Sequence, residues 1–214
     1  MGKGDERRQL ILERAAQNAS RLGLEGLTIG QLASDLGLSK SGLFAHFRSK
    51  EALQVQTLRH TAELFVDRVV RPALKAPRGE RRLRAIFEHW LAWAEAAVLE
   101  GGCLFVAAAT ELDDLEGPAR DELVRQQRDW LELIANVART GVAEGDFRPE
   151  LDGEQIAHDL YGVMLAYHHA RRLLRDPRAS ERARRAFDAL VEAARAPRPS
   201  RASRASRASR ARAS

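Results

Sequence analysis

The stretch LTIGQLASDLGLSKSGLFAHFRSKEAL, residues 27–53, constrains the fold most because it contains two short helical patterns around one glycine. Thr28 is a suitable N-cap for the first helix, and Gly37 ends that helix because glycine enters left-handed conformations at little steric cost. Ser39 is a good N-cap for the second helix. The apolar residues that can face inward are Ile29, Leu32, Ala33, Leu36, Leu38, Leu43 and Phe47. This pattern predicts a helix-turn-helix.

The residues before this stretch predict one further helix. Between Glu6 and Leu22 apolar residues recur with a helical period, and Gly23 follows them. The apolar positions are Leu10, Ile11, Ala15, Ala16, Ala19 and Leu22. We expect residues 1–50 to form a three-helix unit that is small for independent stability and leans on the segment after it.

Residues 51–196 predict a larger helical unit, so the expected fold class is all-α. Its helical periods cover residues 51–74, 83–98, 118–143 and 152–175, with a last helix from the turn at Pro177 to about Ala196. Pro72 falls in the last turn of the first of these helices. The apolar run from Cys103 to Ala109 has the content of a buried strand, but its three alanines and helical neighbours favour a short helix.

The helix expected from Asp152 to Arg175 is apolar on two faces rather than one, so both faces need a cover. The last helix is amphipathic. Two such helices from each of two chains would form a four-helix dimer interface. The residues predicted at this interface are Tyr161, Leu165, His168, Phe187, Leu190 and Val191.

The positive charge of the chain is concentrated at its end. The net charge is +5, but seven arginines and no acidic residue follow Ala194. Without these seven, 28 of the 35 basic residues remain against 30 acidic residues, a net charge of −2. Residues 197–214 are a repeat of Arg, Ala and Ser with almost nothing to bury, so we expect a disordered tail. The tail is either a solvated end without a specific role or a sequence-independent electrostatic contact to DNA.

Several classes of protein are disfavoured by the sequence. The start of the chain has no continuous apolar run like that of a secretory signal, and no stretch approaches the length needed to span a bilayer. Cys103 is the only cysteine, so an internal disulfide is excluded. These features predict a cytoplasmic protein without a membrane partner. No nucleophile elbow, phosphate-binding glycine loop or catalytic Cys and His set is present, so we expect neither catalysis nor a cofactor.

The segment from Leu10 to Leu53 resembles the DNA-binding domain of the tetracycline-repressor (TetR) family of bacterial transcriptional regulators. The resemblance rests on ILERAA, then Gly23, then the stretch at residues 27–53, in the order and spacing of that family's first helices. It implies an all-helical ligand-binding and dimerisation domain for the remainder. It also implies a homodimeric repressor that a small-molecule effector releases from double-stranded operator DNA. An architectural protein that binds DNA weakly through its basic tail is the alternative.

By position, the resemblance implies a set of DNA-binding residues: Thr28, Ser39, Lys40, Ser41, Gly42, Phe44, His46 and Lys50. Lys40 can donate to guanine acceptors, and Lys50 can neutralise a phosphate. Phe44 stands where the family usually has tyrosine and lacks a hydroxyl that could bind phosphate. Ala19 replaces a frequent large aromatic residue.

The aromatic residues of the larger unit have two interpretations. They can line a cavity for an apolar or aromatic ligand, or they can simply pack a core. The candidate pocket residues are Phe65, Phe87, Trp90, Trp93, Phe105, Trp130, Tyr161 and Met164, with His89, Tyr167 and His168 as possible polar anchors.

Three further features are weaker candidates for a site. Cys103 is either a redox sensor or a small buried residue. Glu154 and His158 have the spacing of two metal ligands but do not make a metal site by themselves, so no metal is expected. The acidic residues after the apolar run are either helix caps or an attraction for a cationic ligand, and they are Asp113, Asp114 and Glu116.

Overall fold

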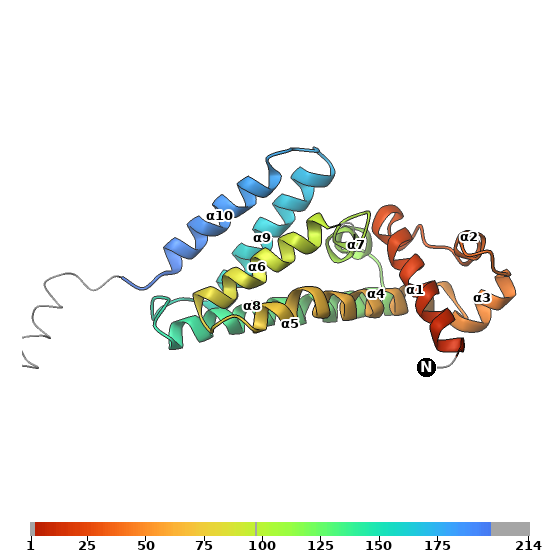
Figure 1. The fold of residues 1–214 in the computed structure, drawn as a ribbon, viewed down its shortest axis with the longest axis horizontal. Coiled ribbons are helices and arrows are strands. Elements are labelled where there is room, and N and C mark those ends of the chain that lie inside the picture. The colour runs from red at the N-terminus through yellow and green to blue at the C-terminus, as the bar shows by residue number, and fades with distance from the viewer. Residues whose placement is uncertain (1–2, 97, 198–214) are drawn as a thin grey trace, which may run out of the picture.

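The computed structural model describes residues 3–96 and 98–197, and its helices form an elongated molecule with a small three-helix unit at one end (Figure 1). In that unit α1 covers Lys3–Leu22, α2 covers Ile29–Asp35 and α3 covers Lys40–Phe47. The helix-turn-helix is therefore formed by α2 and α3, as the sequence predicts. None of the helices in the described part of the chain is long and apolar enough to cross a bilayer.

Hydroxyl side chains begin the helices at the predicted positions. The hydroxyl of Thr28 accepts a hydrogen bond from the backbone N–H of Gln31 (3.2 Å), and that of Ser39 accepts one from Gly42 (3.1 Å). Each cap satisfies an N–H group that has no partner within its own helix. Gly37 has φ of 63°, the left-handed conformation that turns the chain between α2 and α3.

The three-helix unit has its own small core, which the next helix closes. This core consists of Ile11, Leu12, Ala15, Leu27, Leu32, Ala33, Leu43, Phe47 and Leu53. Leu53 belongs to the following helix, which confirms that the unit leans on the segment after it. Two of the apolar positions of α1 lie outside this core: Leu10 is 56% exposed and Leu22 is 60% exposed.

A long helical segment joins the three-helix unit to the rest of the chain. It comprises α4 (Lys50–Phe65), the π-helical segment η1 (Val66–Val70) and α5 (Arg71–Leu74). The backbone N–H of Arg71 donates to the carbonyl of Val66, five residues earlier. Pro72 accounts for this widening, because its ring cannot donate and would clash with a carbonyl four residues before it. The sequence predicts the helix and the place of Pro72 correctly but not the π-helical segment.

The body is completed by α6 (Glu80–Glu95), α7 (Leu104–Leu112), α8 (Pro118–Ala143), α9 (Gly153–Arg172) and α10 (Ala179–Ala194). The all-α fold class is confirmed, and the run after Cys103 is a helix rather than a strand. Two helices end earlier than the sequence predicts. Helix α6 stops before Val98, and α9 stops before Arg175, which has φ of 53° in the turn to α10.

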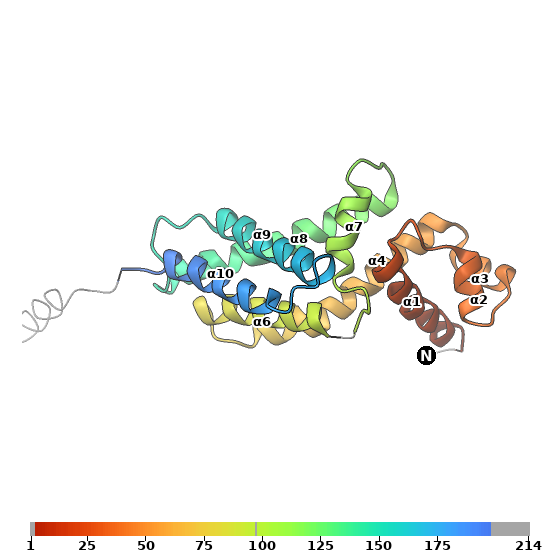
Figure 2. The same cartoon turned by 90° about the horizontal axis from the view of Figure 1, so that it is seen from above.

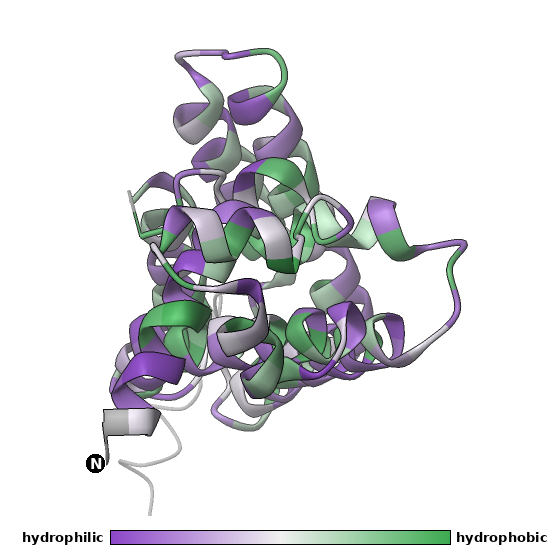
Figure 3. Cartoon of the chain, turned by 90° about the vertical axis from the view of Figure 1, so that its right-hand side faces the viewer, coloured by the Kyte–Doolittle hydropathy of each residue, from purple (hydrophilic) through white to green (hydrophobic). Residues whose placement is uncertain are grey.

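The large core runs through the body and includes part of α1. Its centre is formed by long side chains of α6, α8 and α9, and Ala16, Ala19 and Leu24 of the three-helix unit also join it. Figure 2 shows α9 and α10 lying beside α6 and α8, with the three-helix unit beyond α7. In Figure 3 polar residues dominate the outward faces of the helices, while apolar residues lie between them. Because α1 contributes to both cores, the two units share packing as well as the helix that joins them.

Candidate nucleic-acid interface and effector cavity

The first turn of α3 is exposed, and its polar groups are held in place. Ser39, Lys40, Ser41 and Gly42 are all exposed, whereas Leu43 anchors the helix from below. The Ser39 hydroxyl lies 3.3 Å from the Ser41 hydroxyl in addition to capping the helix. The free N–H groups at a helix start attract negative charge such as phosphate. This end of α3 therefore presents a fixed polar surface to solvent.

The two lysines predicted to contact DNA are in different situations. A methyl group added at Gly30 of α2 would lie 3.3 Å from the Lys40 side chain, so Lys40 extends across the start of α2. The Lys50 ammonium donates to the Glu25 carboxylate (2.9 Å) and to the Glu25 carbonyl oxygen (2.7 Å). This pairing with Lys50 lowers the pKa of Glu25. Lys50 thus holds the loop between α1 and α2 on the start of α4, and the sequence contains no signal for this contact.

The remaining predicted DNA-binding residues surround the same end of the molecule. Thr28 is exposed beside α2, and Phe44 of α3 is 53% exposed. His46 is half-buried, and its ring lies 6.2 Å from that of Phe47. After them Arg48 ends α3 with φ of 60°, a left-handed conformation that brings the chain into α4 within two residues. Six of the eight predicted residues are therefore exposed on or beside α2 and α3, whereas His46 is half-buried and Lys50 is paired with Glu25.

An open cavity of about 670 Å³ lies between the long joining segment and α8. Phe65, Phe105 and Trp130 form its aromatic wall, with Val66 and Val70 of η1 beside them. The Phe65 ring is edge-on to Trp130 at a centroid distance of 4.9 Å and to Phe105 at 5.7 Å. The volume is in the range of sites for small molecules. The π-helical segment thus forms part of the wall of the cavity.

The predicted pocket residues separate into three groups. Phe65, Phe105 and Trp130 line the cavity, and Trp93 packs behind Phe65 at 5.5 Å. Phe87, Trp90 and Met164 are fully packed in the core and do not line it. Tyr161 lies between α8 and α9 in a smaller cavity of about 370 Å³. The three buried aromatic or methionine side chains therefore pack the core and do not bind a ligand in this cavity. None of the suggested polar anchors, His89, Tyr167 and His168, lines the cavity beside η1.

Three polar residues that line the 670 Å³ cavity, Arg59, Arg125 and Gln126, bind one buried carboxylate, that of Glu122. Glu122 is only 6% exposed, and it accepts hydrogen bonds from Arg59 (3.1 Å), Arg125 and Gln126 (2.6 Å). Burial by itself would raise the pKa of Glu122, but these three donors lower it. The cluster joins α4 to α8 beside the cavity. Sequence reasoning missed it because Arg59 and Glu122 are 63 positions apart and only the fold brings them together.

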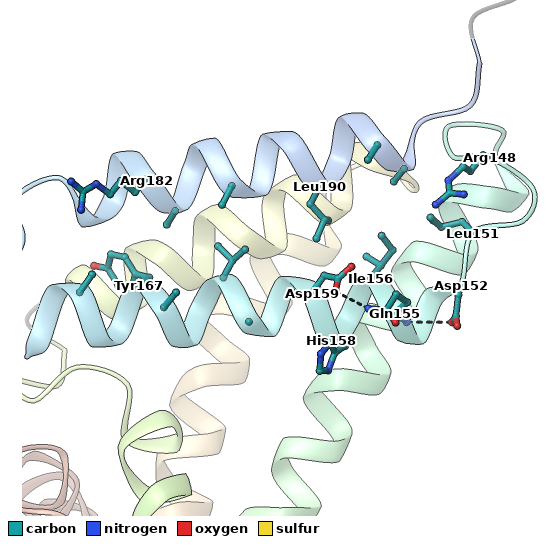
Figure 4. A pocket seen from close by; sticks show the side chains of 18 of the residues that line it. Arg148, Leu151, Asp152, Gln155, Ile156, His158, Asp159, Tyr167, Arg182 and Leu190 are labelled. Carbon is teal, nitrogen blue, oxygen red and sulfur yellow. Dashed lines mark hydrogen bonds between the residues drawn. The ribbon is translucent and has the colours of Figure 1, made fainter.

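A second open cavity, of about 800 Å³, lies along the face formed by α9 and α10. Figure 4 shows Ile156 and Tyr167 of α9 facing Leu190 and Arg182 of α10 across it. Much of the lining consists of glycine and alanine, including Gly162, Ala166, Ala170, Ala183, Ala186 and Ala193. Small residues leave the two helix backbones accessible, so this face forms a shallow apolar groove that another helix could enter.

The predicted dimer residues need correction against this groove. Phe187 is 2% exposed and stacks on Phe87 at 4.2 Å, and Val191 is fully buried. Phe187 packs against α6 of its own chain and Val191 lies in the same core, because α10 turns its strongest apolar stripe inward. His168 lies against Gly102, so it too faces its own chain. Leu165 is 41% exposed and Leu190 lines the groove, so these two remain at the surface.

The weaker candidates are explained by local packing. Cys103 is buried at the start of α7, and burial raises the pKa of its thiol, which keeps it protonated at neutral pH. Glu154 is paired with Arg139 of α8. The acidic residues Asp113, Asp114 and Glu116 are exposed in the loop between α7 and α8, and none of them lines either large cavity.

The fold and the exposed helix α3 define a helix-turn-helix DNA-binding protein with a separate helical body. A family model described as "Bacterial regulatory proteins, tetR family" matches residues 11–56, and one described as "Tetracyclin repressor-like, C-terminal domain" matches residues 79–187, more than half of the chain. The chain therefore belongs to the TetR family and is a DNA-binding transcriptional regulator.

Known relatives support the same assignment. The chain is 27% identical to the transcriptional repressor KstR2 of Mycolicibacterium smegmatis over 153 residues, which covers 68% of this chain and 70% of KstR2. It is 28% identical to the repressor DhaR of Mycobacterium sp. over 167 residues, covering 74% and 80% of the two chains. A TetR regulator from Chloroflexus aurantiacus has a similar structure, with a TM-score of 0.80, 28% identity and coverage of 90% and 96%.

Proposed function

We propose that the protein is a homodimeric transcriptional repressor that leaves its operator when a small molecule binds in the body. The observation that carries this proposal is the exposed, capped first turn of α3 at the end of an all-helical body with a cavity. In a helix-turn-helix the second helix enters the major groove with its first residues against the base edges. The residues assigned to DNA are Thr28, Ser39, Lys40, Ser41, Gly42, Phe44 and His46, while Lys50 positions the loop before α2.

The groove along α9 and α10 supports the assignment of the dimer. Leu190 and Gly162 line this groove, and a methyl group added at Gly162 would meet no atom within 4 Å, so Gly162 faces open space. A second copy related by a two-fold axis would bury the groove against the same face of its partner. Gly162→Leu should block that approach and give a monomer in sedimentation experiments, whereas Gly162→Ala should stay dimeric. A wild-type chain that is monomeric at micromolar concentration would contradict this part.

The cavity beside η1 supports an apolar or aromatic effector. Its walls belong to both the joining segment and α8, so a ligand there would push on the helix that carries the three-helix unit. Movement of that helix changes the distance between the two copies of α3, which must match half-sites about 34 Å apart. A ligand can shift the protein away from its DNA-binding conformation only if it binds more tightly to the conformation in which the joining helix has moved.

Operator binding is tested with the DNA that flanks the protein's own gene. In gel-shift measurements Lys40→Ala should weaken specific binding by about tenfold or more, because a lysine contact to guanine is lost in each half-site. Lys75→Ala is the matched control, since it removes an exposed lysine at the end of α5. If both variants bind like the wild type, α3 is not the recognition helix.

Effector release is tested with the wild type and one cavity variant. A panel of apolar and aromatic compounds is screened for release of the bound DNA, and each active compound is then tested on Ala62→Phe. Ala62 lines the cavity, and a phenyl ring would fill part of the space. The variant should keep operator binding and lose the response. An undiminished response in Ala62→Phe would place the effector elsewhere.

The basic tail provides the test of the architectural alternative. The described chain ends at Pro197, beyond α10 and at the end of the molecule opposite α3 (Figure 1). We therefore assign sequence-specific binding to α3 and not to the tail. Deletion of residues 197–214 should leave specific operator binding intact and reduce only salt-sensitive, non-specific binding. Loss of specific binding on deletion would favour the architectural function.

A further inference from the structure

Phe44 has an unusual position for an apolar aromatic residue in this chain. It is 53% exposed, whereas Phe47, one turn later on the same helix, is 1% exposed in the small core. Helix α3 is anchored by Leu43 and Phe47, so the Phe44 ring is not needed to hold the helix. Leaving a phenyl ring in water gives up the free energy that burial would provide. A contact made only in the complex with DNA would recover it.

Phe44 lies on α3 beside the residues that we assign to the base edges. Residues three and four apart share a helix face, so Phe44 follows Ser41 and Lys40 along the surface assigned to the base edges. The ring has no donor or acceptor, and it cannot form a hydrogen bond to a phosphate oxygen. The carbonyl of Phe44 is already used, because it accepts from the N–H of Arg48 at 2.8 Å. Only an apolar contact is left for this residue.

Base edges in the major groove offer one apolar group. Guanine, cytosine and adenine present hydrogen-bond donors and acceptors there, whereas thymine also presents its 5-methyl group. We infer that Phe44 is a specificity-determining residue that recognises the 5-methyl group of one thymine in each operator half-site. This inference rests on the proposed role of α3, and it adds the class of base that the residue selects.

The test uses an operator selected from random DNA with the full-length protein. Each thymine of the half-sites is replaced in turn by deoxyuridine, which keeps the base pairing and removes only the methyl group. One symmetric position should weaken wild-type binding about fourfold when one half-site is changed and about fifteenfold when both are changed, the effect of one buried methyl group in each. No position with such a penalty would overturn the inference.

Variants at position 44 test whether the loss of affinity on removal of the thymine methyl group depends on the Phe44 ring. Phe44→Ala should bind more weakly and should no longer distinguish thymine from deoxyuridine at that position, while Phe44→Tyr should keep the penalty because it keeps the ring. Leu74→Ala is the matched control, since it removes another exposed apolar side chain at the end of α5. If Phe44→Ala binds too weakly to measure, Phe44→Leu replaces it and should show a smaller penalty. An unchanged penalty in the Ala or Leu variant would overturn the inference.

Failure of the inference is distinguishable from failure of the proposed function. If the wild type selects no sequence from random DNA, both the recognition by α3 and the role of Phe44 are wrong. If it selects a palindromic site whose binding does not depend on any thymine methyl group, the repressor assignment stands and only the role of Phe44 is wrong.

Discussion

The carboxylate of Glu111, on α7, accepts a hydrogen bond from the backbone N–H of Leu24 at a distance of 2.7 Å. Its second oxygen accepts from the N–H of Glu25 at 2.5 Å. The same loop is held from the other side by Gln54 of α4, which donates to the Leu24 carbonyl at 2.9 Å. The loop before α2 is therefore fixed between α7 and α4. Since Phe105 at the start of α7 lines the cavity, α7 connects the cavity to this loop.

Glu111→Ala should loosen the loop between α1 and α2. Two hydrogen bonds to a charged acceptor are lost, and we expect the free energy of unfolding to fall by about 1 to 3 kcal/mol. Hydrogen exchange of the Leu24 and Glu25 amides should accelerate. Glu111→Gln keeps one acceptor and should lose less, and Glu116→Ala, which removes an exposed acid from the loop after α7, is the control. Unchanged exchange at Leu24 in the Ala variant would mean that Glu111 does not hold the loop.

Gly101→Ala should disturb the contact between α1 and the loop that follows α6. A methyl group at this position would lie 1.7 Å from the Ser20 carbonyl oxygen, a backbone atom that cannot rotate away. The Gly101 N–H also donates to the Ser20 hydroxyl at 3.0 Å. We expect the free energy of unfolding to fall by about 2 kcal/mol or more in urea titrations.

Gly4→Ala provides the comparison for that substitution, because Gly4 lies in α1 with nothing within 4 Å of the added methyl group. It should be neutral or slightly stabilising, since alanine has the higher helix propensity. Equal stability of the two variants would show that the Gly101 contact is not close in solution.

The sequence predicts the helices well because their signals are local. Thr28, Gly37 and Ser39 each act on residues within one turn, and their roles depend on nothing distant. The residues of the cavity are predicted less well. Phe65 and Phe87 have the same apolar character and helical spacing, and only the packing of α7 and α8 decides that one lines the cavity and the other is covered by α10.

The dimer surface shows the same limit. An apolar stripe on α10 predicts that a cover exists but not whether that cover belongs to the same chain. In the structure Phe187 packs against α6 of its own chain, and the alanine-rich side of α10 lines the open groove. Alanine carries little apolar signal, so the accessible face is weaker in the sequence than the buried one.

The ion pair of Glu80 with Arg195 should make stability depend on acid pH. Both guanidinium contacts are short (2.7 and 2.8 Å), and hydrogen bonding to Arg195 lowers the pKa of Glu80 from 4.5 to about 2. A folded-state pKa below the unfolded value stabilises the fold above about pH 4.5, and this contribution disappears as the pH falls toward 2.

The size of the acid effect is tested by substitution. After allowance for solvent screening at this partly exposed pair, the contribution should be about 1 to 2 kcal/mol. Glu80→Gln should be less stable than the wild type at pH 7, and the difference should shrink as the pH falls below 4.5. Glu150→Gln, at an exposed position after α8, should follow the wild type. A difference that stays constant from about pH 7 to pH 2 would contradict the pairing.

Phe65→Ala should destabilise the body strongly, because this ring contacts three others at the end of α4. Its centroid lies 5.5 Å from Trp93, 5.7 Å from Phe105 and 4.9 Å from Trp130. Truncation of a buried phenylalanine costs about 3 to 5 kcal/mol, and we expect a value near the lower limit because the open cavity beside the ring lets water enter. Phe44→Ala, at an exposed phenylalanine, should change the free energy of unfolding by about 0.5 kcal/mol or less. Urea unfolding followed by tryptophan fluorescence measures both. A loss below about 1 kcal/mol for Phe65→Ala would mean that the aromatic cluster does not hold α4 against α8.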